Sequence, residues 1–186
     1  MRCALHTGSL TLSGALVLLL LTAACSDGTP TAPTGQSGIF DDASLFRLIT
    51  QTEPLGMYTS FPNADEFTTG RLNGSEAHGP VVRVRLNTRA MGAVQGGRLP
   101  AGSRFPDGSI VLKELRPSAS AAATAYVVMY RDAANALAGN GWVWAEFSPS
   151  GAVLYSVSNR GTACTGCHLR ERGSQNDLVR TFERQS

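Results

Sequence analysis

Five residues close to the end of the chain, Cys164 to His168, read CTGCH. Two cysteines separated by two residues and followed at once by histidine form the spacing of a c-type haem attachment site. The thiols add to the two vinyl groups of haem, and the histidine ligates the iron on one face. The motif therefore predicts one covalently attached haem c, held by Cys164 and Cys167, with His168 as the proximal iron ligand and no other metal.

The position of the motif restricts what can bind the second face of the iron. His168 is followed by 18 residues (186 − 168), and none of them is Met or His. A second axial ligand would have to precede the motif, and the candidates are Met57, His78, Met91 and Met129. Met91 and Met129 lie in apolar runs typical of a core, and His78 lies in a segment typical of a surface loop. The simplest interpretation is a five-coordinate iron with an open or water-filled face, which can bind and transform small molecules.

The N-terminus has the pattern of an export signal. Arg2 precedes an apolar run at residues 10–23, which is too short for a comfortable membrane span. The run ends in LTAAC, which is similar to a bacterial lipobox, so we expect cleavage that removes residues 1–24 and lipidation of Cys25. Thr22 stands where such a motif usually has Leu, and an ordinary signal peptide cut near TAA is the alternative.

These features predict where the protein resides. A lipid on Cys25 would tether the domain to a membrane face, and the following Ser26 is typical of sorting to an outer membrane. We therefore expect an exported, lipid-anchored protein on the periplasmic side. Residues 25–38 are rich in Gly, Pro, Ser and Thr and predict a flexible tether, with the haem domain at residues 39–186. A net charge of +2 does not indicate a nucleic-acid partner.

The four cysteines have separate predicted uses. Cys3 lies in the signal, Cys25 is the lipid site, and Cys164 and Cys167 belong to CTGCH, which leaves none for a structural disulfide. A redox-active CxxC usually begins a helix in a βαβ unit, a pattern that this sequence lacks. A zinc site would need a fourth ligand, which only His78 or scattered carboxylates could supply. These two alternatives, and a chance occurrence of the motif, are less favoured than haem attachment.

The order of strand and helix patterns predicts an α+β fold. A helix is expected at residues 40–52, capped by Asp41 or Asp42, and a short one at residues 89–97. A last helix is expected in residues 174–184, with Leu178, Val179 and Phe182 on its buried side. About five mainly antiparallel strands are expected between the terminal helices: residues 81–87, 110–115, 125–130, 142–147 and 152–157.

Alternation within the predicted strands places particular side chains on shared faces. Lys113, the only lysine in the chain, falls on the same face as Val111 and Leu115. Trp144 and Glu146 share one face of their own strand.

Three stretches together resemble the cytochrome P-460 family, which includes the cytochromes c-prime-beta: VVRVRLNTRA, then FPDGSIVLKEL, then GNGWVWAEF followed by CTGCH and NDLVRTF. The resemblance covers most of the chain from residue 40 onward. It implies a largely antiparallel sheet with flanking helices, often in a homodimer, with the haem near the C-terminal motif. The enzymatic branch oxidises hydroxylamine, with nitric oxide chemistry at an open iron, and the c-prime-beta branch binds nitric oxide in an apolar distal pocket.

The resemblance also assigns roles to single residues. Lys113 matches a lysine that is cross-linked to the haem ring in the enzymatic branch, and a strand lysine reaching out from an edge is the alternative. Val127 stands where that branch has a proton-accepting carboxylate, which argues against hydroxylamine turnover unless Glu146 takes its place. A non-catalytic gas binder with Val127 or Met129 in its distal pocket and a simple electron-transfer cytochrome are the alternative functions. The redox partner is not indicated.

Overall fold

The computed structural model describes residues 41–62, 64–71, 75–170 and 176–181. The predicted signal peptide, the lipidation site at Cys25 and the predicted tether lie outside these residues. Within the described part of the chain, no helix is long and apolar enough to cross a membrane.

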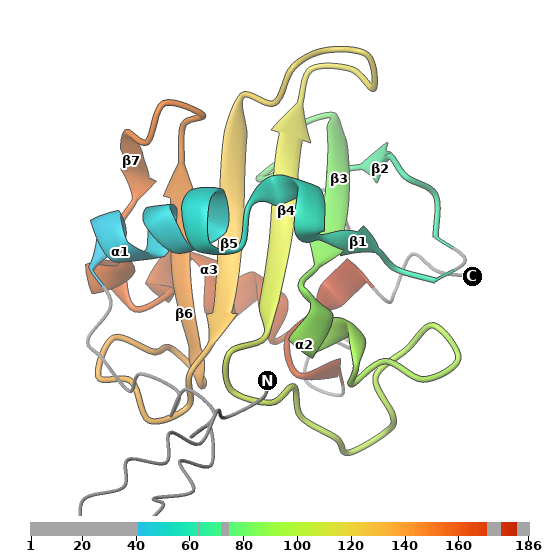
Figure 1. Cartoon of the computed structure of the whole chain (residues 1–186), viewed down its shortest axis with the longest axis vertical. Helices are drawn as coiled ribbons and strands as arrows, with labels where there is room; N and C mark the ends of the chain where they lie inside the picture. The colour runs from blue at the N-terminus through green and yellow to red at the C-terminus, as the bar shows by residue number, and fades with distance from the viewer. Residues whose placement is uncertain (1–40, 63, 72–74, 171–175, 182–186) are drawn as a thin grey trace, which may run out of the picture. The chain divides into compact units, whose positions relative to one another are not determined.

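An antiparallel sheet forms the centre of the described domain (Figure 1). Its five longer strands are β3 (Val81–Leu86), β4 (Ile110–Arg116), β5 (Ala125–Arg131), β6 (Trp142–Phe147) and β7 (Val153–Tyr155). Each pairs with the next one along the chain in antiparallel register. The five predicted strands are therefore confirmed, and the sheet with its few helices agrees with the predicted α+β class.

Two further strands are only two residues long. β1 (Thr59–Ser60) and β2 (Thr68–Thr69) both pair with β3, so the sheet has seven strands where about five were predicted. Alternation cannot be recognised over two residues, which is why the sequence pattern did not indicate them. β2 leads into the loop that carries His78.

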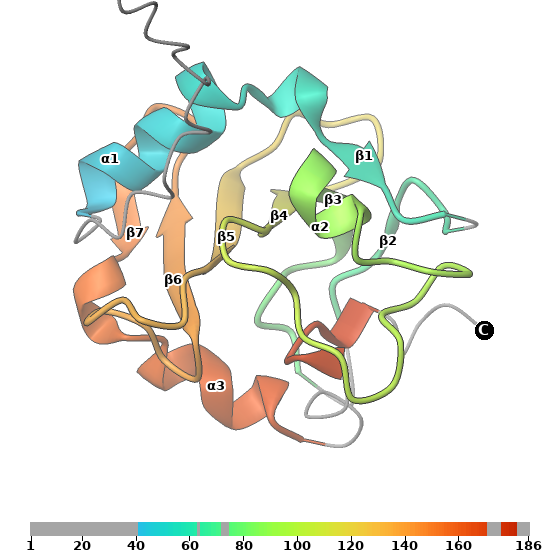
Figure 2. The same cartoon turned by 60° about the horizontal axis from the view of Figure 1, so that its bottom comes forward.

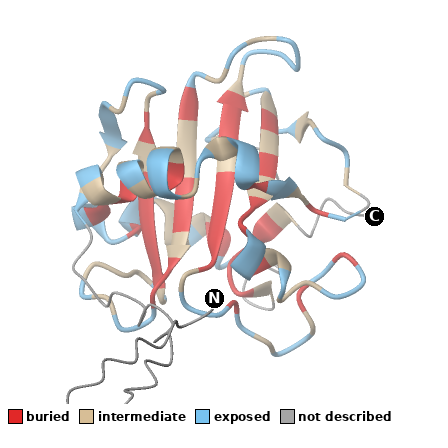
Figure 3. Cartoon of the chain, viewed as in Figure 1, coloured by how far each residue is buried: buried red, intermediate tan, exposed pale blue. Residues whose placement is uncertain are grey.

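Different parts of the chain cover the two faces of the sheet (Figure 2). One face packs against α1 (Asp42–Arg47) and the π-helical turn η1 (Leu48–Thr52), which bury Leu45 and Ile49 between themselves and the strands. The opposite face lies under α3 (Thr162–His168) and the segment 176–181. Buried residues gather along the central strands (Figure 3), because these strands are covered on both sides.

The helix predicted at residues 40–52 is confirmed as α1 followed by η1, with Asp41 as the N-cap. The Asp41 carboxylate accepts a hydrogen bond from the Ser44 backbone at 2.7 Å, and the Ser44 hydroxyl accepts one from the Asp41 backbone at 3.1 Å. This reciprocal capping box satisfies two backbone donors at the start of the helix. A short 3-10 turn, η2 (Leu55–Met57), then leads into β1.

The helix predicted at residues 89–97 is much shorter in the structure. α2 (Thr88–Met91) begins at the N-cap Asn87 and ends at Gly92. Gly96 and Gly97 follow with φ values of 56° and 84°. These left-handed conformations cannot continue a right-handed helix, so the second half of the predicted segment is a loop.

The predicted C-terminal helix is not an α-helix in the described residues 176–181. Asp177 and Leu178 have φ values of 50° and 69°, which are opposite in sign to those of a right-handed helix. Their carbonyl oxygens accept hydrogen bonds from Trp142 Nε1 and His168 Nδ1, partners outside the segment. Leu178 and Val179 are buried as predicted, and Phe182 lies outside the described residues.

Candidate haem site

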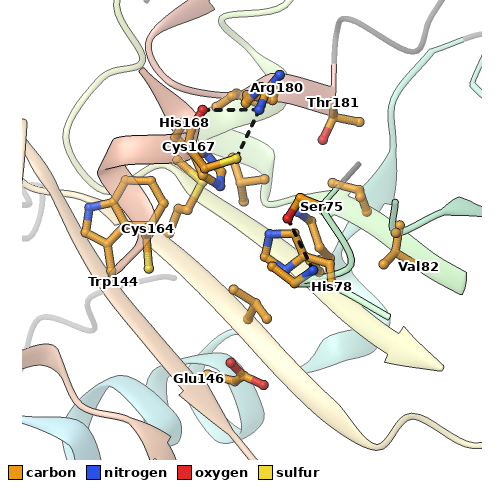
Figure 4. Close-up of a pocket in the computed structure, with 18 of the residues that line it drawn as sticks. Ser75, His78, Val82, Trp144, Glu146, Cys164, Cys167, His168, Arg180 and Thr181 are labelled. Carbon is orange, nitrogen blue, oxygen red and sulfur yellow. Dashed lines mark hydrogen bonds between the residues drawn. The ribbon is translucent and has the colours of Figure 1, made fainter. Parts of the chain in front are cut away.

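α3 places the CTGCH motif against the sheet. The helix begins after Gly161, which has a φ of 67° and lies so close to Trp144 that an added Cβ would be 2.3 Å from the indole ring. A side chain at this position would push α3 away from the strands. Cys164 and His168 are four residues apart and share one face of the helix. Together with Cys167 they line a pocket between α3 and the sheet (Figure 4).

His168 is held as a neutral, oriented imidazole. Its side chain is buried, and Nδ1 donates a hydrogen bond to the Leu178 carbonyl oxygen at 2.7 Å. Because a carbonyl oxygen can only accept, Nδ1 carries the proton and Nε2 keeps its lone pair. Burial lowers the pKa of His168 to about 4, so the ring is neutral at neutral pH. The Trp144 ring, 4.8 Å away between centroids, packs edge-on against it.

The strained segment that supplies the Leu178 carbonyl is anchored by Asp177. The buried Asp177 carboxylate accepts hydrogen bonds from Arg104 Nη1 at 2.8 Å and from the Phe105 backbone at 3.0 Å. Its own carbonyl accepts one from Trp142 Nε1 at 3.0 Å. Asp177 was not predicted from the sequence, since a carboxylate that positions a backbone acceptor for another side chain has no motif.

The two thiols of the motif have different surroundings. Cys164 is half-buried against the core, and burial raises the pKa of its thiol. Cys167 accepts a hydrogen bond at Sγ from Arg180 Nη1 at 3.1 Å, and the same nitrogen donates to the Cys167 carbonyl at 3.1 Å. Neither cysteine is in a disulfide, so both thiols remain able to react.

A row of side chains from four strands forms the floor of the pocket. Lys113 on β4 lies opposite Val127 on β5, Val127 lies opposite Glu146 on β6, and Glu146 lies opposite Tyr155 on β7. All four residues line the pocket. The register therefore brings the three predicted strand residues Lys113, Val127 and Glu146 together, although 33 positions (146 − 113) separate the first from the last.

Charge within this row is partly shielded from water. Glu146 is half-buried, and burial raises the pKa of its carboxyl group. Burial lowers the pKa of His168, and the Lys113 ammonium lowers it further. Burial raises the pKa of Cys164, and the Lys113 ammonium opposes that rise. The pocket thus holds a carboxyl group whose pKa lies above that of an ordinary surface glutamate.

The structure separates the four candidates for a second iron ligand. Met57 is exposed and Met91, the last residue of α2, packs against the core, and neither is among the residues that line the pocket. Met129 lines the pocket from β5, in register with Val111 and Trp144 on the neighbouring strands. His78 lines it from the loop between β2 and β3.

The pocket has mostly apolar walls, and its cavity volume is about 220 Å³. Its sides come from the sheet, from α3, and from residues 68–70, 75, 77, 78 and 179–181.

A family model described as Cytochrome P460 matches residues 65–181. The chain belongs to the cytochrome P460 family. No curated protein matches the chain closely enough to be counted as a relative. The matched span runs from the segment before β2 to the end of the described residues, so it contains every strand that lines the pocket and the whole CTGCH motif.

Membership of the family means that this is a haem protein. The residues present fit that cofactor, because the neutral His168 presents a free nitrogen to a large, mainly apolar pocket. Trp144, Val111 and Met129 supply apolar surface, and Lys113 and Arg180 supply positive charge at the pocket wall. This composition suits a flat, hydrophobic ring that carries acidic side groups.

Proposed function

We propose that the protein is an exported, lipid-anchored, single-haem c-type cytochrome that acts on hydroxylamine or nitric oxide. Cys164 and Cys167 would hold the haem covalently, His168 would ligate its iron, and Cys25 would carry the lipid on the periplasmic side. The observation that carries the proposal is the row Lys113, Val127 and Glu146, which faces the CTGCH helix across one pocket. A carboxyl group at that place is suited to proton transfer beside a redox centre.

The haem, when bound, supplies the iron at which a small nitrogen oxide binds and through which electrons leave. The chain supplies the remaining functions. Val127, Met129 and Trp144 keep water away from the pocket floor, and Glu146 accepts a proton that hydroxylamine releases when it is oxidised. Glu146 accepts a proton only in its ionised form, and burial raises its pKa. As the pH falls, turnover should therefore begin to decrease at a higher pH than it would with an ordinary glutamate as the proton acceptor.

Replacing Glu146 with Gln is expected to reduce hydroxylamine turnover by about 10²–10⁴-fold, the usual effect of losing a general base. Binding of nitric oxide should remain near the wild-type level, because the amide keeps the shape of the side chain. Reduction of an electron acceptor in the presence of hydroxylamine measures turnover, and optical titration measures nitric oxide binding. Glu66→Gln, which removes an exposed carboxylate, is the matched control. Wild-type turnover in Glu146→Gln would exclude Glu146 as the base.

Lys113 is expected to be cross-linked to the haem ring. The link would replace one N–H bond of Lys113 and one C–H bond of the ring by a C–N bond, with two electrons and two protons passing to an oxidant such as a peroxide. Proteolysis and mass spectrometry should find one haem peptide that contains both CTGCH and Lys113. Lys113→Arg keeps the charge without a comparable amine nucleophile, and should yield haem attached only through CTGCH. A wild-type haem peptide without Lys113 would refute the link and leave haem attachment untouched.

A second function, nitric oxide binding without catalysis, is favoured by one observation. Val127 is the member of the row that lies between Lys113 and Glu146, and it cannot accept a proton. Tight binding of nitric oxide by the ferrous protein, with no hydroxylamine-dependent reduction of an acceptor, would select this function. A homodimer, as the family resemblance implies, is compatible with either of these two functions.

A further inference from the structure

His78 and His168 line the same pocket (Figure 4). Their centroids are 6.2 Å apart, and their planes are nearly perpendicular, at 85°. The His78 side chain is half-buried, and its Nδ1 atom is shielded from solvent. The sequence pattern suggested a surface loop residue at this position, whereas the fold turns it into the haem pocket.

The distance between the two rings is informative. A ring nitrogen lies about 1.2 Å from its centroid, so a direct hydrogen bond of about 2.9 Å between two nitrogens in line would set the centroids about 5.3 Å apart. A metal ion held between the rings by bonds of about 2.0–2.1 Å would set them about 6.4–6.6 Å apart. The observed 6.2 Å is too long for the first arrangement and close to the second. Edge-to-face packing of two rings also allows this distance, within about 4.5–7 Å, and the spin state of the iron distinguishes packing from ligation.

The loop that carries His78 is held by its backbone. The Gly70 amide donates to the Pro80 carbonyl at 3.3 Å, and the Gly79 amide donates to the Glu76 carbonyl at 2.9 Å. Gly70 also lies so close to the loop that an added Cβ would be 2.4 Å from the carbonyl oxygen of His78. These contacts tie the His78 backbone to the ends of β2 and β3, so the fold itself directs the imidazole into the pocket.

We propose that His78 binds the haem iron on the face opposite His168 in the resting protein, and that a small ligand reaches the iron by displacing it. The proposal rests on the haem attachment and the proximal role of His168 proposed above. It replaces the open iron face expected from the sequence with a face that is closed until a ligand competes for it. Displacement needs only a movement of the 75–80 turn, because the sheet and α3 hold the rest of the pocket.

A histidine in this place makes the protein selective for ligands that bind iron strongly. The apparent dissociation constant equals the intrinsic one divided by the fraction of molecules in which His78 is off the iron. If His78 is bound in about 99% of molecules, the apparent affinity is reduced about 100-fold. Weak ligands would then leave the iron closed, whereas nitric oxide would open it.

The test uses the full chain purified with its haem. We expect a six-coordinate, low-spin optical spectrum for the ferric wild type at neutral pH and a high-spin spectrum for His78→Ala. Free imidazole added to His78→Ala should restore the low-spin spectrum, because it can occupy the vacated position. His78→Met keeps a side chain that can bind iron, and should stay low-spin with a shifted spectrum. Glu76→Gln, an exposed change in the same turn, is the matched control and should leave the spectrum unchanged.

Ligand binding gives a second readout. The apparent dissociation constant for nitric oxide should decrease about 10–100-fold in His78→Ala, because no internal ligand competes. The wild-type binding rate should reach a plateau at high nitric oxide concentration, set by release of His78, whereas the His78→Ala rate should keep rising in proportion to concentration.

The possible outcomes separate this proposal from the proposed function. A high-spin wild type, or a His78→Ala variant that stays low-spin without imidazole, would overturn the role of His78. If such a protein still binds nitric oxide, the proposed function stands without it. A low-spin wild type and a high-spin, imidazole-rescued His78→Ala variant would support the role of His78 even if neither protein reacts with nitric oxide or hydroxylamine, in which case the proposed function fails.

Discussion

Replacing both Cys164 and Cys167 with Ser, in a chain that also carries Lys113→Arg to remove the proposed cross-link, is expected to abolish covalent haem attachment. Each thiol would form its link by adding S–H across a vinyl double bond, a reaction for which a serine hydroxyl is too weak a nucleophile. The pocket and His168 would remain, so haem could still bind without a covalent bond. Extraction with acidified acetone measures the difference: haem should stay with the Lys113→Arg chain and be removed completely when both cysteines are replaced as well.

Single changes and a remote cysteine provide the controls for this experiment. Cys164→Ser and Cys167→Ser should each keep one link, and therefore keep haem after extraction at reduced yield. Cys25→Ser should alter lipidation and keep the haem fully attached, since Cys25 lies outside the CTGCH motif. Haem that resists extraction from the variant lacking Cys164, Cys167 and Lys113 would show that another residue holds it, and the proposed role of the motif would be wrong.

Replacing Glu114 with Gln is expected to destabilise the fold by about 3 kcal/mol, the lower end of the cost of removing one partner from a buried ion pair. Glu114 lies on the face of β4 opposite Lys113 and is 2% exposed. Its carboxylate accepts hydrogen bonds from Arg83 at 2.8 Å, from Arg116 at 2.6 Å, and from Arg85. A neutral amide would leave three neighbouring guanidinium groups without their shared negative charge.

The effect should be visible in thermal unfolding and in its pH dependence. A loss of about 3 kcal/mol lowers the Tm of a protein of this size by about 6–12 °C. Burial alone would raise the pKa of Glu114, but hydrogen bonds from Arg83 and Arg116 outweigh burial and lower it below the 4.5 of an ordinary glutamate. The stabilisation is therefore fully present above pH 4.5, the pKa expected in the unfolded chain, and is lost as the pH falls through the lower folded pKa.

Glu66→Gln is the matched control for Glu114→Gln. Glu66 also pairs with Arg83, at 2.9 Å, but its side chain is 61% exposed. An exposed pair of this kind contributes about 0–1 kcal/mol, so the Tm should change by no more than about 4 °C. If Glu114→Gln unfolded within the same narrow range as Glu66→Gln, the buried cluster would not be a main source of stability.

The longer elements of the fold could be predicted because their patterns are local. Val82, Val84 and Leu86 alternate with arginines along β3, and all three are buried in the structure. Trp144 and Glu146 face the pocket from β6 as their spacing required. Alternation is a property of neighbouring residues, so it can be recognised without knowledge of the rest of the chain.

Elements that depend on distant partners could not be predicted. Leu178 and Val179 belong to a segment whose apolar spacing is typical of a helix. Asp177 and Leu178 nevertheless take left-handed conformations, because Trp142, Arg104 and His168 donate hydrogen bonds to their polar groups. The loss of helical hydrogen bonds is compensated by tertiary ones.

The candidate site also contains residues that local patterns identified and residues whose role depends on distant partners. The sequence singled out several residues that all line one pocket: Cys164, Cys167, His168, Lys113, Val127, Met129 and Glu146. Glu114 was not singled out as a buried charge, because its burial depends on arginines from β3 as well as from its own strand.

The sequence by itself determined the motif, the strands and the faces that their side chains occupy, since each of these follows from residue types at short spacing. The tertiary structure alone decided which side chains meet. Strand register set Lys113, Val127 and Glu146 in one row, and the close approach of Gly70 turned His78 toward His168. Register and loop closure depend on backbone contacts between segments far apart in the chain, and such contacts leave no short-range pattern to recognise.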